Sequence, residues 1–288
     1  MEEIRKLPKK EFPEGLIEIP QPPKELYIQG NLPSKEDGVL LAVVGSRRFT
    51  TYGRDVCEKI FSGLRNYPIV IVSGLAIGID TLAHQNALKN GLKTIAMPGS
   101  GIDRKVLHPS SNRRLADEII KSGGCLLSEY EPKLPAGAWT FPRRNRLMAG
   151  LSKAVLIIEA GERSGTLITA RLATEYNRDV LAIPGSIFSS NSSGTNSLIR
   201  QGATPINSSE NLLEALGFPS TSFETNLNEL ENCSLDEKRI LEILDDPMPK
   251  DELVRILEIP INEINSILSI MEIKGFIRED VGKLHRII

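Results

Sequence analysis

The amino-acid sequence predicts an α/β fold built on a doubly wound, mainly parallel β-sheet. Two observations support this prediction: short apolar runs without polar alternation, and segments of helical spacing that separate them. Strands of that kind are typical of a sheet covered on both faces, and a strand–helix–strand order gives parallel strands through right-handed crossovers. The predicted strands are 39–44, 69–72, 94–97, 125–127, 154–158 and 180–183.

Helical spacing fills the intervals between these strands, at 52–65, 81–89, 112–121, 143–151 and 166–176. A helix at 195–201, a strand at 204–206 and a helix at 210–216 complete a sheet domain that we place at 35–216. Residues 217–233 are rich in Ser, Thr, Asn and Glu and predict a linker. A second domain at 234–288 then shows helical spacing at 235–244, 250–257 and 261–273, followed by strands at 274–278 and 281–286.

The composition is that of an ordinary globular protein. Its 288 residues are 40% hydrophobic, which is enough for a sizeable core. The net charge is −2, but residues 207–246 hold ten acidic and two basic residues, so the rest of the chain is positive. Three widely spaced cysteines, and histidines without metal-ligand spacing, predict a reduced, cytoplasmic protein with no metal and no cofactor. No signal peptide or membrane span is expected.

Three arginines, Arg143, Arg144 and Arg146, follow Pro142, a residue suited to the first position of a helix. The helix dipole already presents positive charge there, so each added cation costs a few tenths to about 1 kcal/mol. Their concentration indicates an anionic partner, since a helix start binds phosphate well. The alternative is structural, with the arginines paired to nearby acids: Glu129, Glu131 or Glu159.

Glycine and small polar residues follow five of the predicted strands. Because the carboxyl ends of parallel strands meet at one edge of a sheet, we expect these loops to form one rim. Glycines let the backbone approach a ligand closely, and their N–H groups can bind an anion. The loops are 45–48, 73–80 with Gly74 and Gly78, 98–101, 164–166 (Ser164, Gly165, Thr166) and 184–186.

The rim lacks the glycine patterns of common nucleotide-binding loops. The stretch Gly45-Ser46-Arg47-Arg48-Phe49-Thr50 is not a dinucleotide fingerprint, and no P-loop sequence is present. Asp80 is expected to cap a helix that begins at Thr81, and His84 to be a core or surface histidine. No catalytic residue is predicted.

Several motifs follow one another along the chain: Gly45-Ser46-Arg47 with Tyr52-Gly53, SGLAIGIDTLAH at 73–84, LLSE at 126–129, FPRRNRLMAGLS at 141–152 and EAGERSGTLITARLA at 159–173. In this order they resemble the DNA-processing protein A family, also called DprA or Smf. The resemblance implies a Rossmann-like domain preceded by an extended lead-in, here 1–34. It further implies a non-enzymatic protein that binds single-stranded DNA, protects incoming strands in natural transformation, forms a homodimer and helps to load the RecA recombinase.

On this resemblance, Ser46, Arg47 and the arginines of the FPRRNR segment match the DNA-contacting motifs of the family. Arg47, Arg143, Arg144 and Arg146 would neutralise phosphates, and Phe141 would stack on a base. Asn145 would bond either a base edge or its own loop.

The tail at 234–288 resembles the small winged-helix domain that ends many family members. Its third helix is expected to present polar and acidic side chains without lysine or arginine: Asn262, Glu263, Asn265, Ser266 and Ser269. This pattern favours protein interaction or regulation over duplex binding.

Two alternatives remain open at this point: a nucleotide-binding sensor and a nucleotide phosphoribohydrolase. Enzymes of the second kind carry a P-G-G-x-G-T-x-x-E signature. The nearest segment here, 163–169, has Thr169 where the catalytic glutamate would fall.

Overall fold

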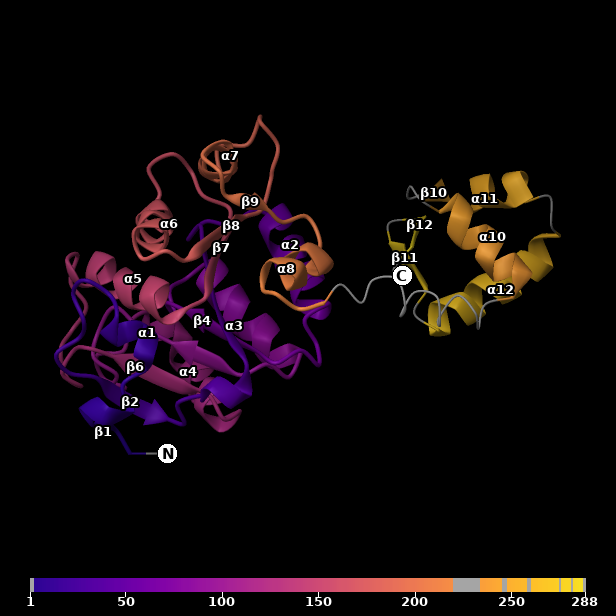
Figure 1. Ribbon diagram of the computed structural model, residues 1–288. Helices are drawn as coiled ribbons and strands as arrows, with labels where there is room; N and C mark the ends of the chain where they lie inside the picture. Colours follow the sequence, from indigo (N-terminus) through magenta and orange to yellow (C-terminus); the bar gives the residue numbers. More distant parts are fainter. Residues whose placement is uncertain are drawn as a thin grey trace. The chain divides into compact units, whose positions relative to one another are not determined.

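A computed structural model describes residues 3–219, 234–244, 248–257, 260–274, 276–280 and 282–286. The chain divides into two compact units, Met1–Pro219 and Ser220–Ile288 (Figure 1). The first unit contains a nine-stranded sheet of order β1-β2-β6-β5-β4-β3-β7-β8-β9. All neighbours from β6 to β9 are parallel, whereas β1 and β2 are antiparallel additions at one edge. The predicted doubly wound, mainly parallel sheet is confirmed.

Every strand predicted for this unit is present, and its two ends lie within one residue of the predicted ones. The strands of the unit are β1 (Arg5–Lys6), β2 (Tyr27–Gly30), β3 (Val39–Gly45), β4 (Ile69–Ser73), β5 (Thr94–Ala96), β6 (Cys125–Ser128), β7 (Ala154–Ile158), β8 (Asp179–Ala182) and β9 (Thr204–Pro205). Only β1 and β2 have no counterpart among the predicted strands.

Helices cover both faces of the sheet. On one face lie α2 (Thr51–Ser62), α3 (Ile79–Lys89), α4 (Arg113–Lys121) and α8 (Ser209–Ala215). On the other lie α1 (Glu14–Ile17), α5 (Thr140–Leu151), α6 (Thr166–Glu175) and α7 (Ser193–Arg200). The central strand β3 alternates between the two cores, with Leu41 and Val43 in the first and Ala42 and Val44 in the second. This explains why its sequence shows no polar alternation.

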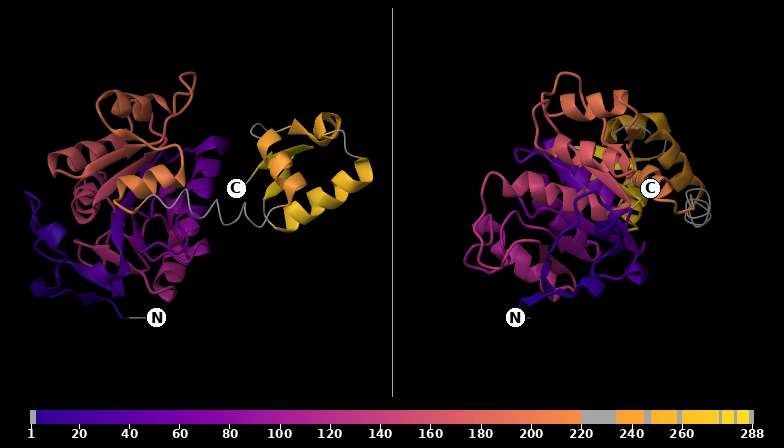
Figure 2. Two further views of the ribbon diagram at one scale, coloured as in Figure 1. Left: turned by 45° about the vertical axis from the view of Figure 1, so that its right-hand side comes forward. Right: turned by 60° about the vertical axis from the view of Figure 1, so that its left-hand side comes forward.

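The lead-in is part of the sheet unit. Strand β2 pairs with β6, β1 pairs with β2, and Leu16 of α1 is fully buried against the sheet. In Figure 2 this indigo segment lies at the edge of the sheet opposite the orange α7–β9 segment. Strands of two and four residues are too short to show a periodicity, which is why the sequence predicted only an extended segment.

Helices α5 and α3 begin earlier than predicted, which changes the positions of Pro142 and Asp80 in them. Helix α5 begins at Thr140, so Pro142 is its third residue, still among the first-turn positions whose N–H groups have no intrahelical partner. Helix α3 begins at Ile79 with Gly78 as its N-cap residue. The expectation that Asp80 caps this helix was therefore wrong. Asp80 lies inside the first turn and its carboxylate accepts a hydrogen bond from the Gly74 N–H at 3.1 Å.

The second unit contains three helices and a small sheet among its described residues. Its elements are α10 (Leu235–Ile243), β10 (Met248–Pro249), α11 (Lys250–Leu257), α12 (Ile261–Ile273), β11 (Ile277–Asp280) and β12 (Lys283–Arg286). Along α12, Glu263, Ser266 and Ser269 are exposed as expected, but Asn265 is half-buried. The side chain of Asn262 and the predicted linker beyond residue 219 lie outside the described residues. Within the described part of the chain, no helix is long and apolar enough to cross a membrane.

His84 is a core residue, as the sequence analysis expected. It is fully buried in α3, and its Nδ1 lies 2.7 Å from Thr94 Oγ1. The Thr94 hydroxyl donates its own proton to the carbonyl oxygen of Ile71 at 2.9 Å, so His84 Nδ1 is the donor to Thr94. Burial lowers the pKa of His84 to about 3. The imidazole is therefore neutral in the folded protein.

This pKa predicts acid sensitivity. Because the folded-state pKa lies below the unfolded value of about 6.5, the stability that neutral His84 contributes is complete above pH 6.5. It is lost as the pH falls from 6.5 toward 3. By pH 5 the loss amounts to about 2 kcal/mol. The variant His84→Asn keeps a donor to Thr94 but does not titrate, so its unfolding free energy should fall less between pH 7 and pH 5. Urea unfolding at each pH measures this, and an equal fall in unfolding free energy for the two proteins between pH 7 and pH 5 would contradict it.

Candidate nucleic-acid interface

The candidate site lies where the order of the sheet reverses. The chain runs from β3 outward through β4, β5 and β6, then returns to add β7 on the other side of β3. In open α/β sheets, ligands bind beyond the carboxyl ends of the strands at such a switch point. A cleft of about 740 Å³ occupies this position, between the loops that follow β3 and β7 and the first turns of α5 and α6.

The cleft collects most of the residues that the sequence singled out. Its walls include Ser46, Arg47, Phe141, Arg144, Asn145, Ser164, Gly165 and Thr166. Four predicted site residues are outside its lining: Gly74, Gly78, Arg143 and Arg146.

Exposed Arg47 and half-buried Phe141 lie side by side in one wall. The Arg47 guanidinium carbon lies 5.1 Å from the centre of the Phe141 ring, in cation–π geometry. The Ser46 hydroxyl accepts a hydrogen bond from the Arg48 N–H at 3.1 Å, which shapes the turn that presents Arg47. Gly78, at φ +93°, packs beneath this turn, where a Cβ would lie 2.3 Å from the Ser46 carbonyl oxygen. The absence of a side chain at Gly78 therefore allows it to pack closely against this turn.

Arg144 is buried and has partners within the protein. Its Nη1 donates to the carbonyl oxygens of Gly74, at 2.5 Å, and Met97, and its Nε donates to Asn145 Oδ1 at 3.2 Å. Burial raises the pKa of the neighbouring Asp80, and the positive charge of Arg144 opposes that rise. Gly74 lies between the two, because a Cβ there would come within 2.5 Å of both side chains. Arg144 thus organises the loops after β4 and β5, and its contact with a phosphate stays a prediction.

The structural alternative for the arginines applies to Arg146. Its side chain is 7% exposed, forms an ion pair with Glu129 and donates to the Gln21 carbonyl oxygen at 2.7 Å. Arg143 is more open, at 55% exposed, with its Nε 3.5 Å from Glu129 Oε1. Glu159 does not pair with an arginine in the described residues, since its carboxylate accepts from the Thr50 N–H at 2.9 Å and the Thr50 hydroxyl at 2.5 Å.

Hydrogen bonds hold the opposite wall in place. Thr166 Oγ1 donates to the Gly45 carbonyl oxygen at 3.1 Å, which joins the start of α6 to the end of β3. Ser164 Oγ accepts from the Thr166 N–H at 3.2 Å. Asn145 is buried and its Nδ2 lies 3.5 Å from the Gly165 carbonyl oxygen, so it bonds within the protein to the loop that follows β7, and its contact with a base edge stays a prediction.

The cleft also contains Arg48, Arg163 and Asn191, which were not predicted as site residues. Both arginines are exposed, and Asn191 Nδ2 donates to the Arg48 carbonyl oxygen at 2.9 Å. Arg48 lies in the predicted loop at 45–48 and Arg163 in the resemblance segment at 159–173, so a count of cations in those two segments would have found both. Asn191 comes from the loop between β8 and α7, where no motif marks it. Among the described residues, Arg47, Arg48 and Arg163 form no ion pair.

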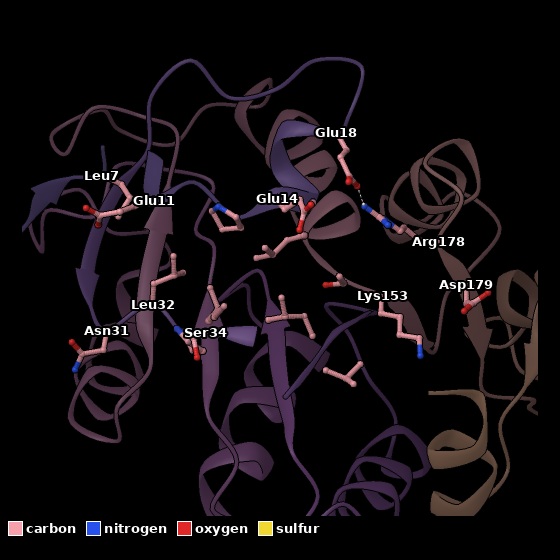
Figure 3. Close-up of a pocket in the computed structure, with 18 of the residues that line it drawn as sticks. Leu7, Glu11, Glu14, Glu18, Asn31, Leu32, Ser34, Lys153, Arg178 and Asp179 are labelled. Atoms are coloured by element: carbon pink, nitrogen blue, oxygen red, sulfur yellow. Dashed lines mark hydrogen bonds and ion pairs between the residues drawn. The ribbon is translucent and has the colours of Figure 1, made fainter. Parts of the chain in front are cut away.

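A larger cavity, of about 1140 Å³, lies at the amino-terminal edge of the strands (Figure 3). It is lined by apolar residues such as Leu7 and Leu32 and by charges of both signs. All three of its cations have partners: Arg178 lies 3.3 Å from Glu18, Arg5 lies 3.2 Å from Glu11, and Lys153 donates to the Leu216 carbonyl oxygen at 2.7 Å. The smaller cleft holds three arginines without an ion pair among the described residues, and one of them, Arg47, lies over an aromatic ring, so it is the stronger candidate for binding an anionic polymer.

These features define a class: a Rossmann-like unit with a cationic cleft at its switch point, followed by a small helical unit that ends in a β-hairpin. The family described as DNA recombination-mediator protein A matches residues 4–217, and the DprA winged helix domain matches residues 224–283. The chain belongs to the DprA/Smf family.

Individual relatives agree with this assignment. Protein Smf of Escherichia coli is 36% identical over 275 residues, which cover 92% of this chain and 72% of that protein. DNA processing protein DprA of Streptococcus pneumoniae is 45% identical over 207 residues, 72% of each chain.

Two solved structures share the fold. The X-ray structure of DprA from Streptococcus pneumoniae has a TM-score of 0.66 at 42% identity and covers 73% of this chain and 74% of that one. The structure of DprA from Helicobacter pylori, which was described for its single-stranded DNA binding mode, also has a TM-score of 0.66. It is 32% identical and covers 75% of this chain and 98% of that one.

Proposed function

We propose that this protein binds single-stranded DNA in the cleft at the switch point of its sheet. The observation that supports this most directly is that Arg47, Arg48 and Arg163, which form no ion pair within the described part of the chain, line the same cleft as the half-buried Phe141. Arginines neutralise successive phosphates, and an aromatic ring stacks on a base of any identity. The walls hold few groups that are free to read a base edge, since Asn145 and Ser46 bond within the protein. Binding should therefore depend little on sequence.

The wider role that we propose follows the family. The protein would act in the cytoplasm as a homodimer, protect incoming single strands during natural transformation and help to load RecA onto them. It would do so as a binding protein without catalysis. The solved relative from Helicobacter pylori supports the DNA-binding step.

A salt series tests the DNA-binding step. The cleft arginines, together with Arg143 beside the cleft, can neutralise three or four phosphates. Each neutralised phosphate contributes about −0.7 to the slope of the logarithm of the association constant against the logarithm of salt concentration, so we expect a slope of about −2 to −3. Fluorescence anisotropy of a labelled strand of about 20 nucleotides, against the matched duplex, measures this. Affinity that is independent of salt, or stronger for the duplex, would place the site elsewhere.

The two other candidate functions involve a free nucleotide. The same cleft would serve a nucleotide sensor, and incubation with AMP would reveal a phosphoribohydrolase through free adenine. Thr169, which stands where that enzyme class has its glutamate, is buried and lines the cleft. A hydroxyl there lacks the carboxylate that the hydrolysis needs. We therefore expect no adenine release, and sustained turnover would show that the protein is an enzyme.

A further inference from the structure

We infer that Trp139 is a second base-stacking platform, outside the cleft. A nucleobase of the bound single strand stacks on it where the strand has passed Phe141 and left the cleft. This inference rests on the proposed function and adds a binding residue to it. Trp139 is the only tryptophan in the chain, and 57% of it is exposed although the next residue, Thr140, is fully buried. Exposure of so large an aromatic side chain leaves apolar area in water that a partner would cover.

The turn that holds Trp139 is fixed by its neighbours. Thr140 N donates to the Gly137 carbonyl oxygen at 3.0 Å, and Thr140 Oγ1 lies 2.5 Å from the carbonyl oxygen of Gly99. The hydroxyl of buried Tyr130 donates to the Thr140 carbonyl oxygen at 3.0 Å. Trp139 therefore sits on an ordered backbone, so little conformational entropy is lost when a base stacks on it.

The indole itself is supported on one side. The Tyr130 ring meets it edge-on, with centroids 5.6 Å apart and an interplanar angle of 89°. Gly137 packs beside the pyrrole part, where a Cβ would lie 3.1 Å from Trp139 Nε1. Glycine at 137 thus leaves room for the ring in this position. The result is a preorganised flat surface rather than a freely rotating side chain.

The position of Trp139 continues the path of the strand. Ala138 and Phe141 on either side of it line the cleft, but Trp139 does not. In a helical turn, residues two apart point in different directions, whereas residues four apart are neighbours. Trp139 has a helical backbone conformation, so its neighbour is Arg143, which is 55% exposed. A strand crossing the first turn of α5 would meet Phe141 on one side, then a cation and an aromatic ring on the other.

Nucleobases fit this surface better than a protein partner does. The platform adjoins a cleft whose unpaired charges suit a phosphate chain, and an aromatic ring beside a cation is the usual arrangement of single-strand binding paths. A protein partner, or a second copy of this chain, would give a different result in the experiment below.

Because Trp139 is the only tryptophan, its fluorescence reports on the platform directly. The full-length protein is titrated with end-labelled oligothymidylates of increasing length, and anisotropy of the label and tryptophan emission are followed together. We expect strands long enough to leave the cleft to quench the emission at saturation. The matched duplex and an abasic oligomer of equal length, which offers phosphates without bases, should not quench it. Binding seen by anisotropy with unchanged emission would overturn the inference while leaving the proposed function intact.

Variants give the second readout. Trp139→Ala should weaken binding of the long strands by about 5- to 50-fold and leave the shortest strands unaffected, whereas Trp139→Phe should stay within about threefold of the native protein. Ile17→Ala is the matched control, since Ile17 is 56% exposed on α1. Native affinity in Trp139→Ala would overturn the inference, as would an emission change on dilution without DNA, which indicates contact between copies. No binding by any strand would instead refute the proposed function.

Discussion

Arg47→Ala is expected to lower the affinity for single-stranded DNA by about one to two orders of magnitude at constant salt. Arg47 is exposed, forms no ion pair among the described residues and lies over the Phe141 ring. In the binding mode that we propose, its removal takes away both a phosphate contact and the planar group that lies over the Phe141 ring. The salt slope should also become less negative by about 0.7, the value for one phosphate on a single strand.

The control for this experiment is Arg171→Ala. Arg171 is a 72% exposed residue of α6 that pairs only with Glu175, at 3.4 Å, among the described residues. The two variants change the net charge equally, so a general electrostatic effect would weaken both to the same extent. Neither should change the melting temperature noticeably, because surface substitutions usually change the free energy of unfolding by no more than about 0.5 kcal/mol. Equal affinities for the two variants would show that DNA does not contact the Arg47 wall.

Arg144→Met is expected to destabilise the protein by roughly 2–5 kcal/mol. The substitution removes the donors to the carbonyl oxygens of Gly74 and Met97 and takes the nearby cation from buried Asp80. Because Arg144 is buried and holds two loops in place, weaker DNA binding by an Arg144 variant does not by itself identify a phosphate contact.

A double-mutant cycle with Asp80→Asn isolates this effect. The double variant should lose less unfolding free energy than the sum of the two single variants, because no unpaired carboxylate remains. The pH dependence gives a second check. Burial already raises the pKa of Asp80, and the loss of Arg144 raises it further. A carboxyl whose folded pKa lies above its unfolded value destabilises the fold as the pH rises through it, so the deficit of Arg144→Met should shrink between pH 7 and pH 5. Additive, pH-independent losses in urea unfolding would contradict the coupling.

The sequence by itself determined the order and type of most elements of the first unit. Uninterrupted apolar runs such as 154–158 mark strands that are buried on both faces, and helical spacing marks the segments between them. Both signals are local, since each depends only on residues that are close together in the sequence. The glycine and serine loops after the strands were also visible, and the parallel topology alone brings their ends to one edge.

Only the tertiary structure decided which arginines are free. Arg144 bonds the Gly74 carbonyl oxygen, 70 residues away, and Arg146 bonds that of Gln21, 125 residues away. Arg47 has no such partner among the described residues and stays in solvent. The three side chains look alike in the sequence because a charge carries no local sign of its partner. Whether an arginine holds the fold together or faces a ligand depends on contacts between distant segments, and the sheet order that creates those contacts follows from packing the whole chain.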